Sequence, residues 1–420
     1  MERQESNIVL INQYYYPFQT ATAQLLEELA EYLAQKGKKI SIITGTNGKK
    51  DLLSRESRNG VLIHRVKNSA DGNRILRKFF SYLSFHFSLW KTMKGLENRS
   101  ILMTFSTPPL CGFFPQKYKK KKDLFMIINS QDLYPDLLVA LKRINPNSML
   151  FKCLRSAAKR IYNNSDRIVT VGYEMKGIIS QRYRIDEGKV KVIENWALDD
   201  LEKNPITPVK KEDERALKIL YTGNMGRSHE YKTLLDGIKG LRNTPGIDFI
   251  ITGGGYNYEI FKKEAEKDNL GNIRFKGFVP KKELSELIDS ADLCIVIGNE
   301  ELIGHVVPSK FYGYLSRAKP ILYINSGNDE ISHHISIGRF GFQISNGSAK
   351  DFCKVVFDVY SNKAILSEMS VRAASYYAAN LKRSLSLDKY LSLIEESEET
   401  LAKSNRATYG YHRSRRFLPD

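Results

Sequence analysis

The sequence predicts an α/β protein made of two doubly wound parallel-sheet domains that face a cleft. The chain has 420 residues, more than one hydrophobic core usually organises. Short apolar strands alternate with helical patterns through residues 1–198, and the alternation restarts at residue 216. The strands are apolar throughout, as expected for parallel strands covered on both faces. Ligands of such folds bind at the carboxyl ends of the strands, so we expect the site in the cleft.

The first domain is predicted over residues 1–198 and opens with a strand at Ile8–Ile11. A loop rich in tyrosine leads into a helix whose apolar residues, Leu25 to Leu33, recur at helical spacing, and Gly37 ends it. Further strands are predicted at 40–44, 61–66, 101–105, 124–128, 167–171 and 190–193.

Residues 199–215 are polar, contain two prolines and are predicted to be a linker. The second domain, residues 216–380, has predicted strands at 217–222, 248–252, 273–275, 293–297 and 321–324. A helix at 381–401 is expected to pack back on the first domain, and we expect the basic tail 402–420 to be mobile.

The composition excludes several classes of protein. A hydrophobic fraction of 42% argues against a disordered chain. No apolar run is long enough for a spanning helix, and the N-terminus lacks the pattern of a signal peptide. The four cysteines lack metal-ligand spacing and are expected to be reduced core residues of a cytosolic protein.

The net charge of +18 is concentrated in one half of the chain. Residues 1–200 hold 33 basic and 19 acidic side chains, whereas residues 201–420 hold 32 and 28. Nucleic acid, an anionic membrane or a phosphorylated substrate could each explain a basic half, and so could a solvated face without a partner.

Four glycine- or proline-containing turns of the second domain suggest phosphate binding. In YTGNMGRSHEYK, Gly223 and Gly226 permit a tight turn, and Arg227 and Lys232 could place cations beside an anion, although such glycines also occur in ordinary turns. A second glycine loop follows in ITGGG, with Gly253 and Gly254.

In FKGFVP, the backbone near Phe278 and Val279 could bind a nucleotide base, while Phe278 could equally be a core residue. Pro308 and Ser309 are predicted to begin a helix, with Ser309 as a plausible N-cap. Lys310 is unfavourable in a first helical turn unless an anion binds there, which favours a functional role.

The order of these motifs resembles the donor domain of the retaining glycosyltransferase family 4, which has the GT-B fold of two Rossmann-like domains. In the first half, NQYYYPFQTATAQ, STPPL, NSQDLYPD and VIENW are similar to the same family. The resemblance covers roughly residues 7–380 and is greatest to members that build exopolysaccharide, capsule or O-antigen.

The resemblance implies roles for individual residues. Arg227 and Lys232 match the pair that binds the donor diphosphate, and Phe278 with Val279 match the segment that holds the base. Asp132 matches a position beside the reacting sugar; Asp132, Arg227 and Lys232 are therefore the predicted catalytic residues. The donor-binding set adds Gly223, Gly226, Gly253, Gly254, Pro308, Ser309 and Lys310, and the acceptor-side loop contributes Tyr16, Thr20, Ala21 and Thr22.

One feature departs from the family pattern. Many members carry two glutamates separated by seven residues, and His305 and Gly313 occupy those positions here. We interpret this as divergence of a subfamily, although lost activity is an alternative. Glu300, Glu301 and Glu330 remain acidic candidates near the cleft, or are solvated loop charges.

A membrane contact is predicted for the first domain. The stretch from Arg74 to Leu96 places aromatic and basic residues in helical rows, as in interfacial helices, although a core helix with a solvated rim is the alternative. A lysine run follows further along the chain. The predicted membrane residues are Arg74, Arg77, Lys78, Phe79, Phe80, Trp90, Lys119, Lys120, Lys121 and Lys122.

The resemblance and the charge pattern together predict a glycosyltransferase on the inner face of the cytoplasmic membrane. We expect it to transfer a hexose-type sugar from a nucleotide-diphosphate donor to a polyprenyl-diphosphate-linked glycan, with retention and without a cofactor, a metal or nucleic acid. His333 and His334 are expected to be a surface pair. The alternatives are a GT-B sugar-nucleotide epimerase, a nucleic-acid binder and a non-catalytic assembly partner.

Overall fold

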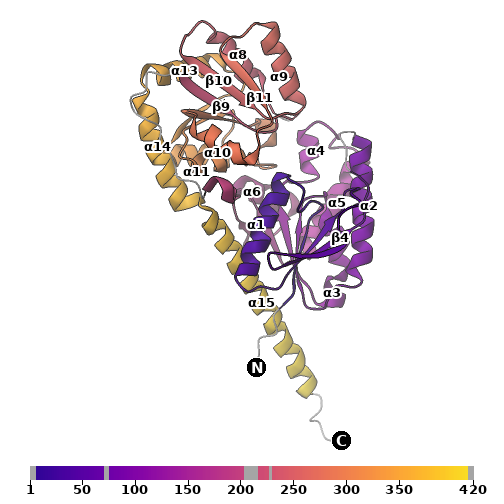
Figure 1. Ribbon diagram of the computed structural model, residues 1–420. Coiled ribbons are helices and arrows are strands. Elements are labelled where there is room, and N and C mark those ends of the chain that lie inside the picture. The colour runs from indigo at the N-terminus through magenta and orange to yellow at the C-terminus, as the bar shows by residue number, and fades with distance from the viewer. Residues whose placement is uncertain (1–5, 71–74, 203–215, 227–228, 415–420) are drawn as a thin grey trace, which may run out of the picture.

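The computed structural model describes residues 6–70, 75–202, 216–226 and 229–414, with only the backbone described for residues 75, 199, 281 and 404–414. Two α/β domains lie one above the other in Figure 1, with the C-terminal helix α14 (Ala364–Tyr376) beside the second domain and the following helix α15 (Arg383–Ser414) beside the first. Within the described residues, no helix combines the length and the apolar character needed to cross a bilayer.

The first domain is built on an eight-stranded sheet in the order β3-β4-β2-β1-β5-β6-β7-β8. Neighbouring strands pair in parallel, except that β3 pairs antiparallel with β4 at the edge. The sequence analysis missed β3 because RESR is polar and its side chains alternate between exposed and half-buried. The strands are β1 Ile8–Ile11, β2 Ile40–Gly45, β3 Arg55–Arg58, β4 Val61–Val66, β5 Ile101–Phe105, β6 Phe125–Ser130, β7 Arg167–Thr170 and β8 Val190–Val192.

Helices cover both faces of this sheet, which explains why its central strands, such as β1 and β5, are buried throughout and almost entirely apolar. Alternate residues of β1 divide between the faces: Ile8 and Leu10 pack in the core beneath α1 and α15, and Val9 and Ile11 pack beneath α2. A further core joins β6 and β7 to α5 and α6. The helices of this domain are α1 Ala21–Gln35, α2 Ile75–Met93, α3 Lys119–Lys122, α4 Asp136–Ala140, α5 Met149–Asn164 and α6 Tyr173–Tyr183.

The second domain has a six-stranded parallel sheet in the order β11-β10-β9-β12-β13-β14. The sequence analysis missed β14, whose four residues GFQI are mostly half-buried or exposed. The strands are β9 Leu217–Tyr221, β10 Ile247–Thr252, β11 Ile273–Gly277, β12 Leu293–Ile297, β13 Ile321–Ile324 and β14 Gly341–Ile344. The helices are α8 Lys232–Gly240, α9 Tyr256–Lys267, α10 Lys281–Asp289, α11 Lys310–Ser316, α12 Glu330–Gly338, α13 Ala349–Ser361 and α14 Ala364–Tyr376.

The chain crosses between the domains twice, at α7 (Asp199–Glu202) and after α14. Glu202 ties the two crossings together, because its carboxylate accepts hydrogen bonds from the Tyr377 hydroxyl at 2.9 Å and the Arg383 backbone N–H at 3.1 Å. Residues 199–202 of the predicted linker form helix α7, and residues 203–215 lie outside the described residues.

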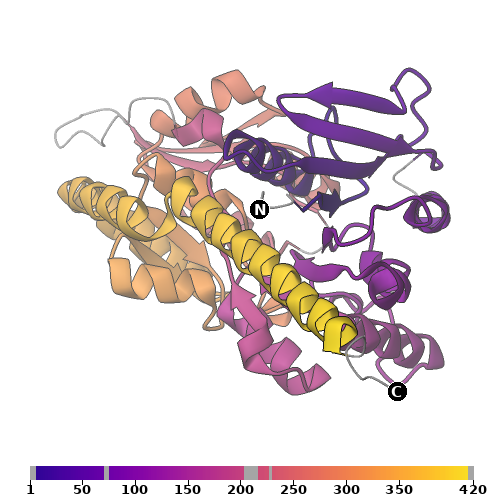
Figure 2. The same ribbon diagram turned by 90° about the horizontal axis from the view of Figure 1, so that it is seen from below.

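The last helix, α15 (Arg383–Ser414), returns to the first domain, as Figure 2 shows from below. Tyr390 is buried and its hydroxyl accepts a hydrogen bond from the Asn129 amide at 2.6 Å. The helix was predicted to end at residue 401 with a tail beyond it, which is wrong: it continues to Ser414, and residues 415–420 lie outside the described residues.

The cysteines were expected to be core residues. Cys111 and Cys294 are buried and Cys353 is half-buried, but Cys153 is exposed on α5, so the expectation is wrong for that residue.

Candidate active site

Two cavities adjoin between the domains. The first, of about 590 Å³, is lined on the second-domain side by residues that follow β9 and β12 and by the start of α11. The other, of about 340 Å³, lies against the loops that follow β5 and β6. Ala21, Leu25, Val307 and Ser309 line both cavities, so they form one cleft. We call them the donor-side and acceptor-side cavities, after the predicted roles of the domains.

Lys310 is the basic residue that lines the donor-side cavity among the described residues. Its ammonium group donates a hydrogen bond to the Tyr221 hydroxyl at 2.7 Å and lies 3.9 Å above the centre of that ring. Burial lowers the pKa of Lys310 to about 7, because the charged form has lost most of its hydration. An anion bound in the cavity would restore the charge, so the position suits a diphosphate.

Asp132 is the acid of the acceptor-side cavity. Its backbone N–H donates to the Ser106 hydroxyl at 3.1 Å, and the N–H of the next residue, Leu133, donates to the His305 carbonyl of the other domain at 2.9 Å. Burial raises the pKa of Asp132 to about 6, and the Lys78 ammonium partly opposes that rise. A carboxyl held in this way can change its protonation near neutral pH.

The start of α1 faces the same cavity. Thr20, Ala21 and Thr22 line it, and the Thr20 hydroxyl caps the helix by accepting a hydrogen bond from the Ala23 N–H at 3.3 Å. Tyr16 was predicted for this loop but lines neither cavity. Its ring lies 3.8 Å from the Arg58 guanidinium, and its carbonyl accepts from Arg65 at 3.0 Å.

The two glycine loops mainly hold each other. Gly253 donates its N–H to the Gly277 carbonyl at 2.6 Å, and a Cβ on Gly253 would lie 2.0 Å from the Gly223 oxygen. The Gly254 carbonyl accepts from the Met225 N–H at 2.7 Å. Gly253, Gly254 and Gly226 line neither cavity, whereas Gly223 lines the donor side with its N–H already bonded to Thr252. The predicted cradle of free glycine amides is therefore not the arrangement found for Gly223 and Gly253.

Two family models together account for most of the sequence. The model of Glycosyltransferase Family 4 matches residues 22–197, and the model of Glycosyl transferases group 1 matches residues 202–373. The chain belongs to glycosyltransferase family 4. Over 334 residues it is 24% identical to the probable glycosyltransferase WbjE of Pseudomonas aeruginosa. The matched region covers 77% of this chain and 81% of WbjE.

Solved structures show the same GT-B fold for this glycosyltransferase. Sucrose-phosphate synthase from Thermosynechococcus elongatus superposes with a TM-score of 0.72 at 13% identity, covering 93% of this chain and 99% of that one. HepE of Anabaena in complex with UDP gives a TM-score of 0.68 at 10% identity, covering 93% and 100%. The predictions of a family 4 glycosyltransferase and of its fold are confirmed.

Of the basic pair predicted from the family motif, only Lys232 lies within the described residues. Arg227 falls outside the described residues. Lys232 begins α8, is exposed and lines neither cavity of the glycosyltransferase. Its binding to the donor diphosphate stays a prediction, and Lys310 is the cation that the described structure places there.

The segment predicted to bind the base is at the surface. Phe278 is 79% exposed, so the alternative of an ordinary core residue is wrong. Neither Phe278 nor Val279 lines a cavity of the cleft, and their contact with a nucleotide base stays a prediction. Pro308 and Ser309 do line the donor side, but the Ser309 side chain makes no capping hydrogen bond.

The positions without glutamate have a structural explanation. Gly313 lines the donor-side cavity, and a Cβ there would lie 3.0 Å from a methyl carbon of Leu201 in α7, so a longer side chain meets the interdomain segment. His305 is half-buried, with Nδ1 2.9 Å from the Ile303 carbonyl, and burial lowers its pKa.

The other acidic candidates, Glu300, Glu301 and Glu330, line neither cavity. Glu301 pairs with Lys142 of the first domain at 2.6 Å, Glu300 is exposed, and Glu330 is buried away from both cavities. His334 is buried beside Glu330, so the prediction of a surface histidine pair is wrong for His334 and holds for the exposed His333.

The sequence analysis missed two residues that line the donor side. His229 is held neutral at physiological pH, because burial, with a contribution from the Lys310 charge, lowers its pKa to about 4. Asp329 caps α12 and hydrogen-bonds the Asn325 amide at 2.9 Å. His229 lies within the motif GNMGRSHEYK that was singled out, so its position was the available signal; Asp329 had none.

Proposed function

We propose that this enzyme transfers a hexose-type sugar from a nucleotide-diphosphate donor to a hydroxyl of a polyprenyl-diphosphate-linked glycan, with retention of configuration. The observation that carries the proposal is the single cleft that has Lys310 on one side and Asp132 on the other. The donor half is supported by HepE, which has been crystallised with UDP, with UDP and glucose, and with UDP-glucose.

The departing diphosphate would be stabilised by protein groups. A bound diphosphate would replace the water that the Lys310 ammonium group has lost. The attraction between Lys310 and the diphosphate increases as negative charge develops on the leaving group. His229 is neutral and can offer a hydrogen bond at the same wall. We therefore propose that the chemical step needs no metal.

Asp132 would orient the sugar that reacts. The loop bearing it is held by Ser106 of the first domain and by the His305 carbonyl of the second, so its position depends on how the two domains are arranged. Closure excludes water, which favours transfer over hydrolysis.

Helix α2 supports the proposed membrane contact and, through it, the lipid-linked acceptor. One of its stripes, Ser81, Phe85, Leu89 and Met93, is buried against the sheet. The predicted core helix therefore accounts for that stripe only. A second set of large apolar side chains is exposed on the same helix, namely Leu76, Phe79, Phe80, Leu83 and Phe87.

Basic side chains flank this exposed apolar surface. The Lys91 ammonium lies 4.4 Å from the centre of the Phe87 ring, and that of Lys94 lies 4.8 Å from Trp90. Such a surface favours the interface of an anionic bilayer. Arg77 is exposed on this helix, and Arg74 lies outside the described residues.

Three of the lysines predicted to contact the membrane lie against other parts of the protein, namely Lys119, Lys122 and Lys78. Lys119 pairs with Asp166 at 2.7 Å and Lys122 donates to the Leu96 carbonyl, whereas Lys120 and Lys121 are exposed. Lys78 lies at the rim of the acceptor-side cavity, close enough to lower the pKa of Asp132. We therefore propose that Lys78 contacts the acceptor where it leaves the lipid surface.

The proposal places the enzyme on the inner face of the cytoplasmic membrane, in synthesis of a surface polysaccharide. The donor is tested by thermal shift with UDP-, GDP- and dTDP-sugars on chelator-treated protein. We expect one nucleotide to stabilise the protein without added metal and Lys310→Met to abolish that shift. Equal shifts in both proteins would contradict the assignment of Lys310.

The acceptor side is tested by flotation with phosphatidylglycerol vesicles. The double variant Phe79→Ser/Phe80→Ser is expected to lose most of its binding at moderate salt. Phe357→Ser is the control, since Phe357 is also exposed but lies on α13 of the second domain. Binding lost equally in both variants, or retained in both, would contradict the proposal that the α2 surface contacts the membrane.

A sugar-nucleotide epimerase, the alternative function, would turn over the donor alone and would need no lipid-linked acceptor.

A further inference from the structure

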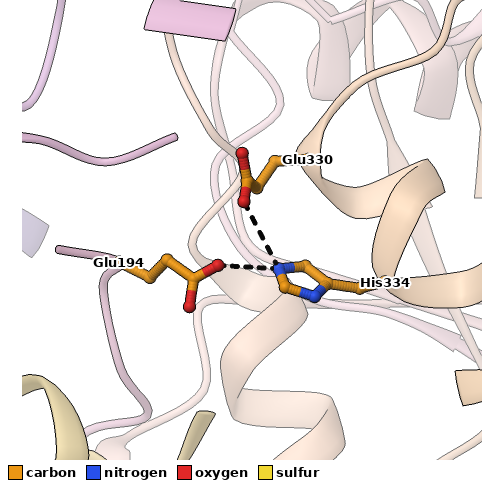
Figure 3. Close-up of side chains that lie close together, drawn as sticks. All are labelled: Glu194, Glu330 and His334. Carbon is orange, nitrogen blue, oxygen red and sulfur yellow. Dashed lines mark hydrogen bonds and ion pairs between the residues drawn. The ribbon is translucent and has the colours of Figure 1, made fainter. Parts of the chain in front are cut away.

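Three buried ionisable side chains meet where the chain crosses between the domains (Figure 3). Glu194 follows β8 of the first domain, while Glu330 and His334 lie one turn apart on α12 of the second domain. One ligand atom from each lies within 4.8 Å of the others. None of the three lines the donor-side or acceptor-side cavity, so they belong to a different place in the molecule.

The side chains point at one another. His334 Nε2 lies 2.9 Å from a carboxylate oxygen of Glu194 and 3.8 Å from Oε1 of Glu330. Glu330 is only 3% exposed. Its Oε2 accepts the Tyr173 N–H at 2.7 Å, and its Oε1 has no hydrogen-bond donor among the described residues. A buried carboxylate oxygen directed at a histidine and a second carboxylate is costly unless a proton or a cation joins them.

The histidine is positioned to offer a lone pair. Its Nδ1 lies 2.8 Å from the Tyr376 hydroxyl, and its ring stacks on Phe311 with centroids 5.7 Å apart. Without a cation, Nε2–H can donate to Glu194 while Nδ1 accepts from the Tyr376 hydroxyl; a cation on Nε2 would need the tautomer whose Nδ1–H donates to Tyr376. Metal-binding histidines are commonly oriented through such a bond from the other ring nitrogen.

We propose that Glu194, Glu330 and His334 bind one first-row divalent cation, best matched by Zn²⁺, which joins the two domains. An imidazole with two carboxylates is a suitable ligand set for Zn²⁺, and small shifts of the side chains would bring all three atoms to coordination distance. The cation would hold the domain arrangement rather than take part in the chemistry, because the three ligands lie outside the cleft.

Protons compete with the cation for this site. Burial, together with the neighbouring Glu194, raises the pKa of Glu330 above its usual range, despite the hydrogen bond from Tyr173. For Glu194, burial is outweighed by the hydrogen bond from His334, and its pKa lies below the usual range. The other groups that face the cluster are Glu174, Asp329, Tyr312, Tyr376 and Lys389. A cation that binds these side chains must therefore displace the protons they hold.

The test is calorimetric titration of the chelator-treated full chain with ZnCl₂. We expect one saturable equivalent, and tighter binding at pH 8 than at pH 6 because imidazole and carboxylate ligands bind a cation when deprotonated. The melting temperature should rise with Zn²⁺. No saturable binding, or an affinity independent of pH, would overturn the proposal.

Substitutions separate this site from other metal-binding groups. Glu330→Gln is expected to weaken Zn²⁺ binding at least tenfold but to leave the melting temperature of the metal-free protein nearly unchanged, because Gln resembles the protonated carboxyl. Tyr376→Phe should weaken binding by roughly tenfold through the histidine alone. The matched control is His333→Gln, an exposed histidine beside His334 on the same helix.

Bound Co²⁺ provides a spectroscopic check. Visible bands of a four-coordinate ion should appear in the parent protein and in His333→Gln, and should be lost in Glu330→Gln. Bands that persist in Glu330→Gln, or a thiolate charge-transfer band from one of the four cysteines, would overturn the assignment. These measurements need no sugar donor, so they are independent of the proposed transferase activity.

Discussion

The two sides of the cleft hold opposite charges under the same physical constraint. On the donor side, burial lowers the pKa of Lys310 to about 7, and its contact is the neutral Tyr221. On the acceptor side, burial raises the pKa of Asp132 to about 6, with Lys78 at the rim. Both groups have given up hydration without a full counter-charge beside them. A substrate that brings a diphosphate to one side and hydroxyl groups to the other would supply what each lacks.

Removing the positive charge of Lys310 should have the largest effect. We expect Lys310→Met to lower kcat/KM for the nucleotide sugar by about 10²–10³-fold, as for loss of one electrostatic contact to a developing negative charge. Steady-state kinetics with a fixed acceptor would measure it, and single-turnover rates would show whether the loss is in kcat.

Lys232→Met is the matched control, because Lys232 is exposed at the start of α8. We expect a change of about threefold or less. If Lys232→Met loses as much activity as Lys310→Met, the donor diphosphate binds at Lys232, as the family resemblance predicts, and not at Lys310 alone.

Neutralising the acid should have the next largest effect. Asp132→Asn is expected to lower kcat by about 10²-fold with little change in donor affinity, because the side chain faces the acceptor side. If the carboxylate is the active form, the parent activity falls below pH 6 and that acidic limb is absent in Asp132→Asn. An unchanged limb would assign the titration to another group.

The same substitution should stabilise the protein at high pH. The folded pKa of Asp132, about 6, exceeds its unfolded value of about 3.9, so the folded state binds its proton more tightly. This contribution favours folding at low pH and is lost as pH rises through 6. Asp132→Asn should therefore increase the free energy of unfolding by about 1–2 kcal/mol at pH 8 and by almost nothing at pH 4. Urea denaturation at both pH values measures the difference, and equal changes would contradict burial as the cause.

Restoring the glutamate of many relatives tests why it is missing. Gly313→Glu should destabilise the protein by about 2–3 kcal/mol, because its Cβ meets Leu201 at 3.0 Å. The double variant Gly313→Glu/Leu201→Ala should recover part of that loss. If the single variant is as stable as the parent and more active, the glycine reflects lost function rather than the packing of α7.

Much of the fold follows from the strand pattern because apolar strands between helices allow few arrangements. The two strands that were missed, β3 and β14, are short and more exposed than the central strands, so burial does not mark them in the sequence. The extension of α15 to Ser414 was missed because its apolar residues stop recurring after Leu401.

The site was less accessible to sequence reasoning. Lys310 was identified because a lysine in a first helical turn is locally unfavourable, a conflict that the sequence shows directly. The turn at Gly223 was predicted to bind phosphate, but the Gly223 N–H bonds to the Thr252 carbonyl, which only tertiary packing reveals. His334 was placed at the surface because nothing near it in the sequence indicates that Glu194, 140 residues away, covers it.

The smallest expected effect concerns His229, which shares the donor-side wall with Lys310. Because its pKa is lowered to about 4, the imidazole stays neutral from pH 5 to 8 and can contribute a hydrogen bond but no charge. His229→Gln should therefore raise the KM for the donor by roughly 3–10-fold, the range of one neutral hydrogen bond, equally across that pH range. A loss as large as that of Lys310→Met, or one that varies between pH 5 and 8, would show that the histidine carries a proton when the donor is bound. In that case the nearby Lys310 would have to be the neutral partner, and the donor-side charge would reside on His229 instead.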